Sequence, residues 1–193
     1  MYRIVVANLA AGVGKTTVAT HLAASLTRRH HAVTLVTATC PAEVRAASPL
    51  PRDGFVVVDA ATPPGDARAL GGVVDGADFV LVPLTPDSDA GDATIRTIQQ
   101  VLDPRQLRFA VVLNRIDPHR PGEAAWWDRL LDVTYGFPRE ATHLPLLPAG
   151  TPPPRVRHDA HASGAGSFDP FAAASGSLAR ELAHQITANA GMW

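Results

Sequence analysis

The chain has 193 residues, 46% of them hydrophobic and 18% charged, and its formal net charge is −1. This length and balance are typical of one globular domain, so we expect residues 1–193 to form a single domain. The small net charge excludes a global basic field that would attract nucleic acid. A single cysteine, Cys40, excludes an intrachain disulfide and a thiolate metal cluster. With no leader-like segment and no apolar run long enough to span a bilayer, we expect a cytoplasmic protein without a membrane contact.

The stretch from Asn8 to Thr17 reads NLAAGVGKTT. It follows an apolar, β-branched run at 2–7 and precedes a segment at 17–29 with apolar residues at helical spacing. A strand, a small-residue loop ending in Gly-Lys-Thr and a helix are the context of a phosphate-binding loop. Successive N–H groups of such a loop surround phosphate oxygens, and the helix N-terminus adds partial positive charge. The residues that we expect to bind the nucleotide here are Ala11, Gly12, Val13, Gly14, Lys15, Thr16 and Thr17.

Lys15 is the only lysine among the 17 basic residues, and the other sixteen are arginine. A lysine ammonium is a compact point charge, which arginine does not replace at a phosphate contact. We therefore expect Lys15 to contact the β- and γ-phosphates as a catalytic residue, and the Thr16 hydroxyl to ligate Mg²⁺.

Further elements alternate along the chain. Proline residues interrupt 38–53, which we expect to be a loop. The predicted strands after the first lie at 32–37, 54–59, 78–84, 107–114 and 142–147, and the helices lie at 17–29, 67–74, 89–102, 121–133 and 171–190. A proline-, glycine- and serine-rich loop is expected at 148–170.

This alternation predicts an α/β fold, a doubly wound, mostly parallel sheet with helices on both faces, of the P-loop NTPase type. Ligands of such sheets bind at the carboxyl ends of the strands. Asp59 ends the continuously apolar third strand, so it would lie near the phosphate loop. We expect Asp59 and Thr16 to hold Mg²⁺, which needs only one or two protein ligands beside phosphate oxygens, and Asp59 to act with Lys15 in catalysis.

With both elements located, the sequence resembles the ParA/MinD family of deviant Walker A ATPases, and most closely the small ParA-type partition ATPases. The segments that carry the resemblance are 12–17, 56–59, 62–65, 77–86 and 111–117. The resemblance implies ATP or ADP with Mg²⁺, a nucleotide-dependent homodimer, and slow hydrolysis stimulated by a ParB-like adaptor protein. It also implies nonspecific DNA binding, hence association with the nucleoid, in plasmid partition, chromosome segregation or cargo positioning. By the same resemblance Asn114, Arg115 and Pro148 are candidates to contact adenine.

The sequence departs from the family pattern in three places. Ala10 and Ala11 stand where the family carries Lys-Gly, and no second lysine exists. No carboxylate follows the second strand before Glu43, although the family has a water-orienting acid there, and the segment between the second and third strands is short. We therefore expect Mg-ATP binding to survive, and hydrolysis to be slow unless Glu43 or a partner supplies the missing group.

The long loop at 148–170 leaves two alternatives open. Arg155 and Arg157 lie where small ParA-type proteins contact DNA, but they also fit an ordinary solvated loop. His158 and His161 have ligand-like spacing, but no thiolate lies near them, so metal binding is disfavoured. The C-terminal helix has Arg180 as its only fixed cation, which disfavours a membrane anchor.

Two rival functions follow from the departures. One is a degenerate ATPase that uses the nucleotide only to switch a binding module. The other is a P-loop ligase similar to the dethiobiotin synthetases, which would need a substrate pocket with extra cationic groups around the loop.

Overall fold

The structure is a computed structural model that describes residues 1–46, 54–117, 119–138, 143–145 and 170–190. The expected loop at 148–170, with Arg155, Arg157, His158 and His161, lies almost wholly outside these residues, and so does Pro148.

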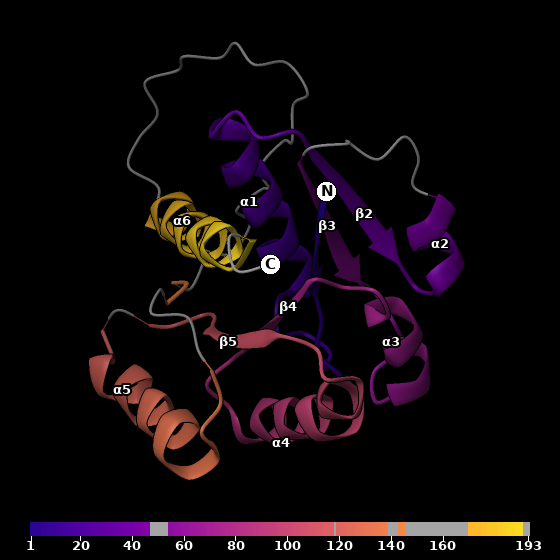
Figure 1. Cartoon of the computed structure of the whole chain (residues 1–193). Coiled ribbons are helices and arrows are strands. Elements are labelled where there is room, and N and C mark those ends of the chain that lie inside the picture. Colours follow the sequence, from indigo (N-terminus) through magenta and orange to yellow (C-terminus); the bar gives the residue numbers. More distant parts are fainter. Residues whose placement is uncertain (47–53, 118, 139–142, 146–169, 191–193) are drawn as a thin grey trace.

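A five-stranded parallel sheet forms the centre of the fold (Figure 1). Its strands are β1 (Tyr2–Val6), β2 (Val33–Ala38), β3 (Phe55–Ala60), β4 (Phe79–Leu84) and β5 (Phe109–Leu113), in the order β2-β3-β1-β4-β5. All four strand pairings are parallel, which confirms the predicted fold class. β1 lies in the middle, and the chain leaves it first toward β2 and later toward β5, so the crevice for a ligand opens at the carboxyl end of β1.

The helices are α1 (Lys15–Arg28), α2 (Pro41–Ala46), α3 (Ala67–Val74), α4 (Ser88–Thr97), α5 (Pro121–Arg129) and α6 (Pro170–Ala190). Alternate residues of each buried strand face two separate hydrophobic clusters. In β1, Ile4 and Val6 pack with α1 and α6, whereas Val5 packs with α3, α4 and α5. Figure 1 shows α1 and α6 side by side, away from α3, α4 and α5. None of the helices among the described residues is long and apolar enough to cross a membrane.

The predicted helix at 89–102 forms, but not as one regular helix. α4 ends at Thr97 and continues as a π-helical turn, Ile98–Leu102. Asp87, Ser88 and Asp89 are all residue types that can cap a helix start, and Asp87 caps α4, because its Oδ1 accepts a hydrogen bond from the Ala90 N–H at 2.7 Å. A similar π-helical segment, Leu130–Tyr135, extends α5.

Two expectations were wrong in detail. Residues 41–46 form α2 rather than a loop: Pro41 occupies the first turn, where a missing N–H costs nothing, and Glu43 caps the helix start. The apolar pattern of 121–133 also predicts that Trp126 and Trp127 both lie on the apolar face of that helix, but Trp127 is 7% exposed, whereas Trp126 is 58% exposed.

The expected strand at 142–147 is described only at 143–145. There Leu144 donates a backbone hydrogen bond to the Leu113 carbonyl at 2.8 Å, and Pro145 forms an isolated parallel bridge with Ile116. This short segment therefore extends the carboxyl end of β5.

Candidate functional site

The loop between β1 and α1 lies at the carboxyl edge of the sheet. Gly14 precedes the first helical residue, Lys15, in a left-handed conformation with φ 84°, and Gly12 has φ 73°. Gly14 is closely packed as well, because a methyl group there would overlap Nδ2 of Asn114. Glycine at position 14 therefore serves both the turn and the close approach of the β5 end to the loop.

Asp59 and Thr16 meet beneath this loop. β3 pairs with β1 so that Asp59 lies opposite Val6, next to the start of the loop. The Thr16 hydroxyl donates a 2.7 Å hydrogen bond to Oδ2 of Asp59, a residue only 2% exposed. Oδ1 of Asp59 is buried and has no hydrogen-bond partner among the described residues. A buried carboxylate oxygen without a partner, beside a hydroxyl, has the donor chemistry that Mg²⁺ requires.

The electrostatics of the pair Lys15 and Asp59 are set by burial. Burial raises the pKa of the Asp59 carboxyl, and the Thr16 hydrogen bond and the Lys15 charge oppose this rise. Burial likewise lowers the pKa of the Lys15 ammonium, and the charge of Asp59 opposes the fall. Both groups are thus poorly solvated in their charged forms. An anionic ligand beside Lys15, or a cationic ligand beside Asp59, would offset the free-energy cost of this desolvation.

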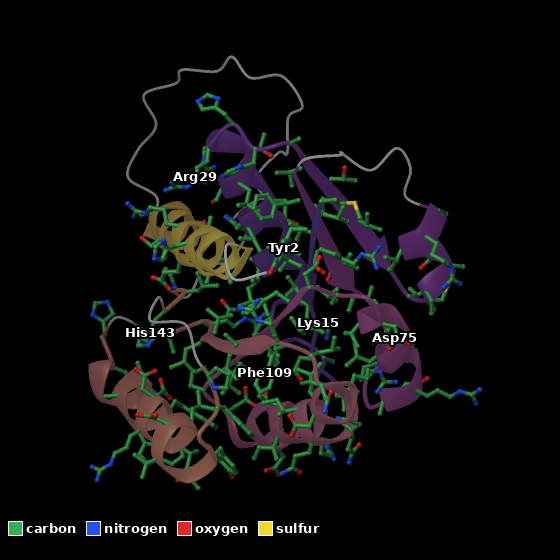
Figure 2. The ribbon with its side chains drawn as sticks, viewed as in Figure 1. Tyr2, Lys15, Arg29, Asp75, Phe109 and His143 are labelled. Atoms are coloured by element: carbon green, nitrogen blue, oxygen red, sulfur yellow. The ribbon has the colours of Figure 1, made fainter. Side chains whose placement is uncertain are left out.

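Lys15 lies near the middle of the molecule in Figure 2. Its ammonium group donates a 2.5 Å hydrogen bond to the carbonyl oxygen of Ala10, which folds the side chain back along the loop. Ala10, which stands in the position of the family's first lysine, thus accepts a hydrogen bond from Lys15 through its backbone carbonyl.

Asn114 anchors the loop from the end of β5. Its Nδ2 donates a 2.8 Å hydrogen bond to the Val13 carbonyl, and its backbone N–H donates to the Leu84 carbonyl at 2.8 Å. Asn114 is 2% exposed, and its Oδ1 has no partner among the described residues. The adjacent Arg115 is exposed.

Two neighbouring pockets open at the loop. The first, of about 320 Å³, is lined by Ala11, Gly12, Gly14, Lys15, Thr16, Ala61, Thr62, Pro64 and Arg115. The second, of about 550 Å³, is lined by Leu9, Ala10, Ala11, Gly12, Pro64, Gly65, Thr85, Asp87, Asp89, Ala90, Ala93, Arg96 and Arg115. Ala11, Gly12, Pro64 and Arg115 line both pockets, so the two spaces are contiguous at these residues.

A buried polar network that the sequence reading missed fixes the first half of the loop. Nδ2 of Asn8 donates to the Pro83 carbonyl at 2.9 Å and to Oγ1 of Thr94 at 2.8 Å. Oδ1 of Asn8 accepts from the Ala10 N–H at 2.8 Å, and Oγ1 of Thr97 accepts from the Leu9 N–H at 2.9 Å. A polar residue directly after an apolar strand was a visible signal at Asn8, whereas the threonines lie in a distant helix and gave none.

Glu43 is already engaged at the start of α2. Its carboxylate accepts hydrogen bonds from the Thr39 N–H at 2.5 Å, the Thr39 hydroxyl at 2.9 Å and the Cys40 N–H at 3.2 Å. These hydrogen bonds lower the pKa of Glu43. The largest effect comes from the Thr39 N–H, and smaller effects come from the Thr39 hydroxyl and the Cys40 N–H. In this arrangement Glu43 caps a helix and is not one of the residues lining either pocket.

Comparisons with known proteins concern the family and the fold of the chain. The family model described as the CobQ/CobB/MinD/ParA nucleotide binding domain matches residues 4–131. No curated protein sequence matches the chain.

Similar solved structures include three kinds of protein. A cobyrinic acid a,c-diamide synthase from Mycobacterium smegmatis, with bound ATP analog and magnesium, has a TM-score of 0.71 at 15% identity, covering 98% of this chain and 97% of that chain. MinD in the MinC:MinD cell division complex of Aquifex aeolicus has a TM-score of 0.63 at 16% identity, covering 77% and 82%. A plasmid partition protein from Borrelia burgdorferi has a TM-score of 0.56 at 13% identity, covering 76% and 90%.

These solved structures share the fold of the chain at low sequence identity. The family model covers most of the strands and helices that position the loop between β1 and α1. The chain therefore belongs to the CobQ/CobB/MinD/ParA family of nucleotide-binding domains, the family that contains the ParA/MinD ATPases.

Proposed function

We propose that the chain binds Mg-ATP at the loop between β1 and α1 and uses it as a slow switch in a partition or positioning system. The observation that carries the proposal is the constellation of Lys15, Thr16 and Asp59 at the end of β1 and β3. Thr16 and Asp59 are hydrogen-bonded at 2.7 Å, and Oδ1 of Asp59 is left buried without a partner among the described residues. Backbone N–H groups of the loop and the N-terminus of α1 add the positive potential that phosphates need.

Thr16 and Asp59 would hold Mg²⁺ in this proposal. When bound, the ion would neutralise charge on the phosphate oxygens. Lys15 would leave the Ala10 carbonyl and contact the phosphates, a bond exchange that replaces one charge-assisted hydrogen bond with another. Asn114 would keep Val13 and Gly14 in the conformation that the phosphate contacts require.

Slow hydrolysis follows from the residues around the pockets. Glu43, the first carboxylate after β2, is held by three hydrogen bonds at the start of α2. Asp59 is hydrogen-bonded to Thr16 and would hold Mg²⁺ in this proposal, whereas Asp87 and Asp89 line only the larger pocket and not the one that Lys15 and Thr16 line. An adaptor protein that supplies the missing group is therefore part of the proposal, as are a nucleotide-dependent homodimer and DNA contacts through Arg155 and Arg157.

The test is phosphate release from Mg-ATP by the purified chain, alone, with DNA of arbitrary sequence, and with DNA plus the product of the adjacent open reading frame. The proposal expects slow turnover alone and faster turnover in the complete mixture, and a shift to a dimer in size-exclusion chromatography with Mg-ATP. The Asp59→Asn variant should remain slow in every mixture. Fast turnover by the chain alone would contradict the proposal.

A P-loop ligase is the second candidate, and one observation favours it. The 550 Å³ pocket beside the loop is lined by Arg96 and Arg115, cationic groups that a second, anionic substrate would need, together with Asp87 and Asp89. The similarity to a cobyrinic acid a,c-diamide synthase is in keeping with this alternative. ATP turnover that depends on an added small carboxylic acid, and not on DNA or a protein partner, would favour the ligase over the switch.

A further inference from the structure

The backbone of Arg115 is strained without a local reason. In the part of the chain that the structure describes, three non-glycine residues have positive φ: His30, Gln106 and Arg115. His30 follows the end of α1 and Gln106 caps a 3-10 turn, positions where a left-handed residue is common. Arg115, with φ 60°, follows strand β5 instead, and a left-handed conformation is unfavourable for a residue with a Cβ. Strain of this kind persists where the surrounding structure serves a function.

This strained residue lies where the two pockets meet. Arg115 lines both the phosphate pocket with Lys15 and Thr16, and the larger pocket with Ala10 and Arg96. Among the described residues lining the phosphate pocket, Lys15 and Arg115 are the two cations. No carboxylate of the described part of the chain pairs with Arg115, although Arg105 and Arg120 each pair with an aspartate.

The neighbouring residues hold Arg115 in place on both sides. Asn114 is fixed by its bonds to Val13 and Leu84, and Ile116 donates its N–H to the Leu144 carbonyl at 3.1 Å. The guanidinium is thus carried on a rigid segment at the mouth of the loop. An adenine contact is the expectation from the family resemblance. A phosphate contact is the alternative, because Arg115 lines the pocket that Lys15 and Thr16 also line, which the proposed function assigns to phosphates.

We infer that Arg115 binds the terminal phosphate of a nucleoside triphosphate from within the same chain, and so makes the site favour the triphosphate over the diphosphate. This inference rests on the proposed nucleotide site and names its regulation. The guanidinium would supply the second positive charge that is missing with Ala10 in the place of the family's first lysine. It would act as a fork of parallel donors, a geometry suited to phosphate oxygens.

The test compares ATP and ADP affinities, each with Mg²⁺, by isothermal titration calorimetry of the full chain. Arg115→Gln should lower ATP affinity about 10- to 100-fold, the range for loss of a hydrogen bond to a charged group, and leave ADP affinity within about twofold. Arg115→Lys should restore part of the loss. The matched control is Arg120→Gln, which removes an exposed arginine that lines neither pocket and should change neither affinity by more than about twofold.

A second variant separates binding from folding. Arg115→Gly removes the side chain and relieves the positive φ, so its denaturant midpoint should rise or stay unchanged while its preference for ATP falls. Equal losses of affinity for ATP and ADP would overturn the inference, because the two nucleotides share the base and the α- and β-phosphates and differ in the terminal phosphate. If the wild type binds both nucleotides and the ratio of ATP to ADP affinity is the same in the variants, the inference about Arg115 is overturned and the proposed function is not. A wild-type chain that binds neither nucleotide would overturn the proposed function as well.

Discussion

Replacing Gly14 with alanine should destabilise the chain more than the same replacement at Gly12. Both glycines have positive φ, 84° and 73°, so an alanine at either position costs about 1–2 kcal/mol of backbone strain. At Gly12 a new Cβ meets nothing within 4 Å, whereas at Gly14 it overlaps Nδ2 of Asn114. Backbone strain therefore destabilises both variants, whereas the overlap with Asn114 destabilises only Gly14→Ala.

The extra cost at Gly14 can be worked out from the Asn114 side chain. To make room, Nδ2 must leave the Val13 carbonyl, to which it donates a 2.8 Å hydrogen bond in a buried environment. Losing that bond and leaving a buried group without a partner costs about 1–3 kcal/mol. We expect Gly12→Ala to cost about 1–2 kcal/mol and Gly14→Ala about 2–5 kcal/mol.

The assay is urea denaturation of both variants at one pH, with equal m-values as the condition for comparing free energies of unfolding. Asn114→Ala provides the control, because it removes the group that the new methyl would strike. In that background the two alanine variants should differ by less than about 0.5 kcal/mol, the range of additive sites. Equal costs in the wild-type background would refute the packing of Asn114 against the loop.

Four other predictions concern the site and the core. Asn8→Ala should lower the free energy of unfolding by about 2–4 kcal/mol in urea denaturation, because its amide makes three buried hydrogen bonds. Trp127→Ala should cost about 3–5 kcal/mol and Trp126→Ala less than about 1 kcal/mol by the same method, since only Trp127 is buried. The lowered pKa of Glu43 in the folded chain stabilises the wild type above the ordinary carboxyl pKa of 4.5, and this stability is lost as pH falls through the lowered pKa. Glu43→Gln should lack this contribution, so the thermal melts of the variant and the wild type should differ at neutral pH and converge in acid. Asp59 has a raised folded-state pKa, so its ionisation destabilises the nucleotide-free chain as pH rises from about 3.8; Asp59→Asn should melt higher than wild type at neutral pH, and the difference should vanish in acid.

The parts of the fold that the sequence predicted are those with local signals. Most residues of the five described strands are apolar, and β4 and β5 are apolar throughout, because both faces of a parallel sheet are covered by helices. The loop before Lys15 was visible because glycines and a single lysine fall between a strand and a helix. Asp59 was visible because an acid ends an otherwise apolar strand.

Features that depend on distant partners were not predictable in the same way. The role of Asn114 under the loop requires a contact between residues 101 positions apart, and the network of Asn8 joins residues 75 to 86 positions apart. α2 was read as a loop because its prolines outweighed the cap that Glu43 provides. The exposure of Trp126 next to the buried Trp127 depends on how α5 packs on α4, which helical periodicity alone does not fix.

The central claim is that the constellation of Lys15, Thr16 and Asp59 binds a magnesium nucleotide. Its most direct test is isothermal titration of the purified chain with ATP in the presence and absence of Mg²⁺, compared with Lys15→Ala. The account predicts saturable binding of one ATP per chain that Mg²⁺ strengthens, and at least a tenfold loss in Lys15→Ala, equivalent to about 1.4 kcal/mol of binding free energy. Absence of binding by the wild-type chain, or equal affinity in Lys15→Ala, would contradict it.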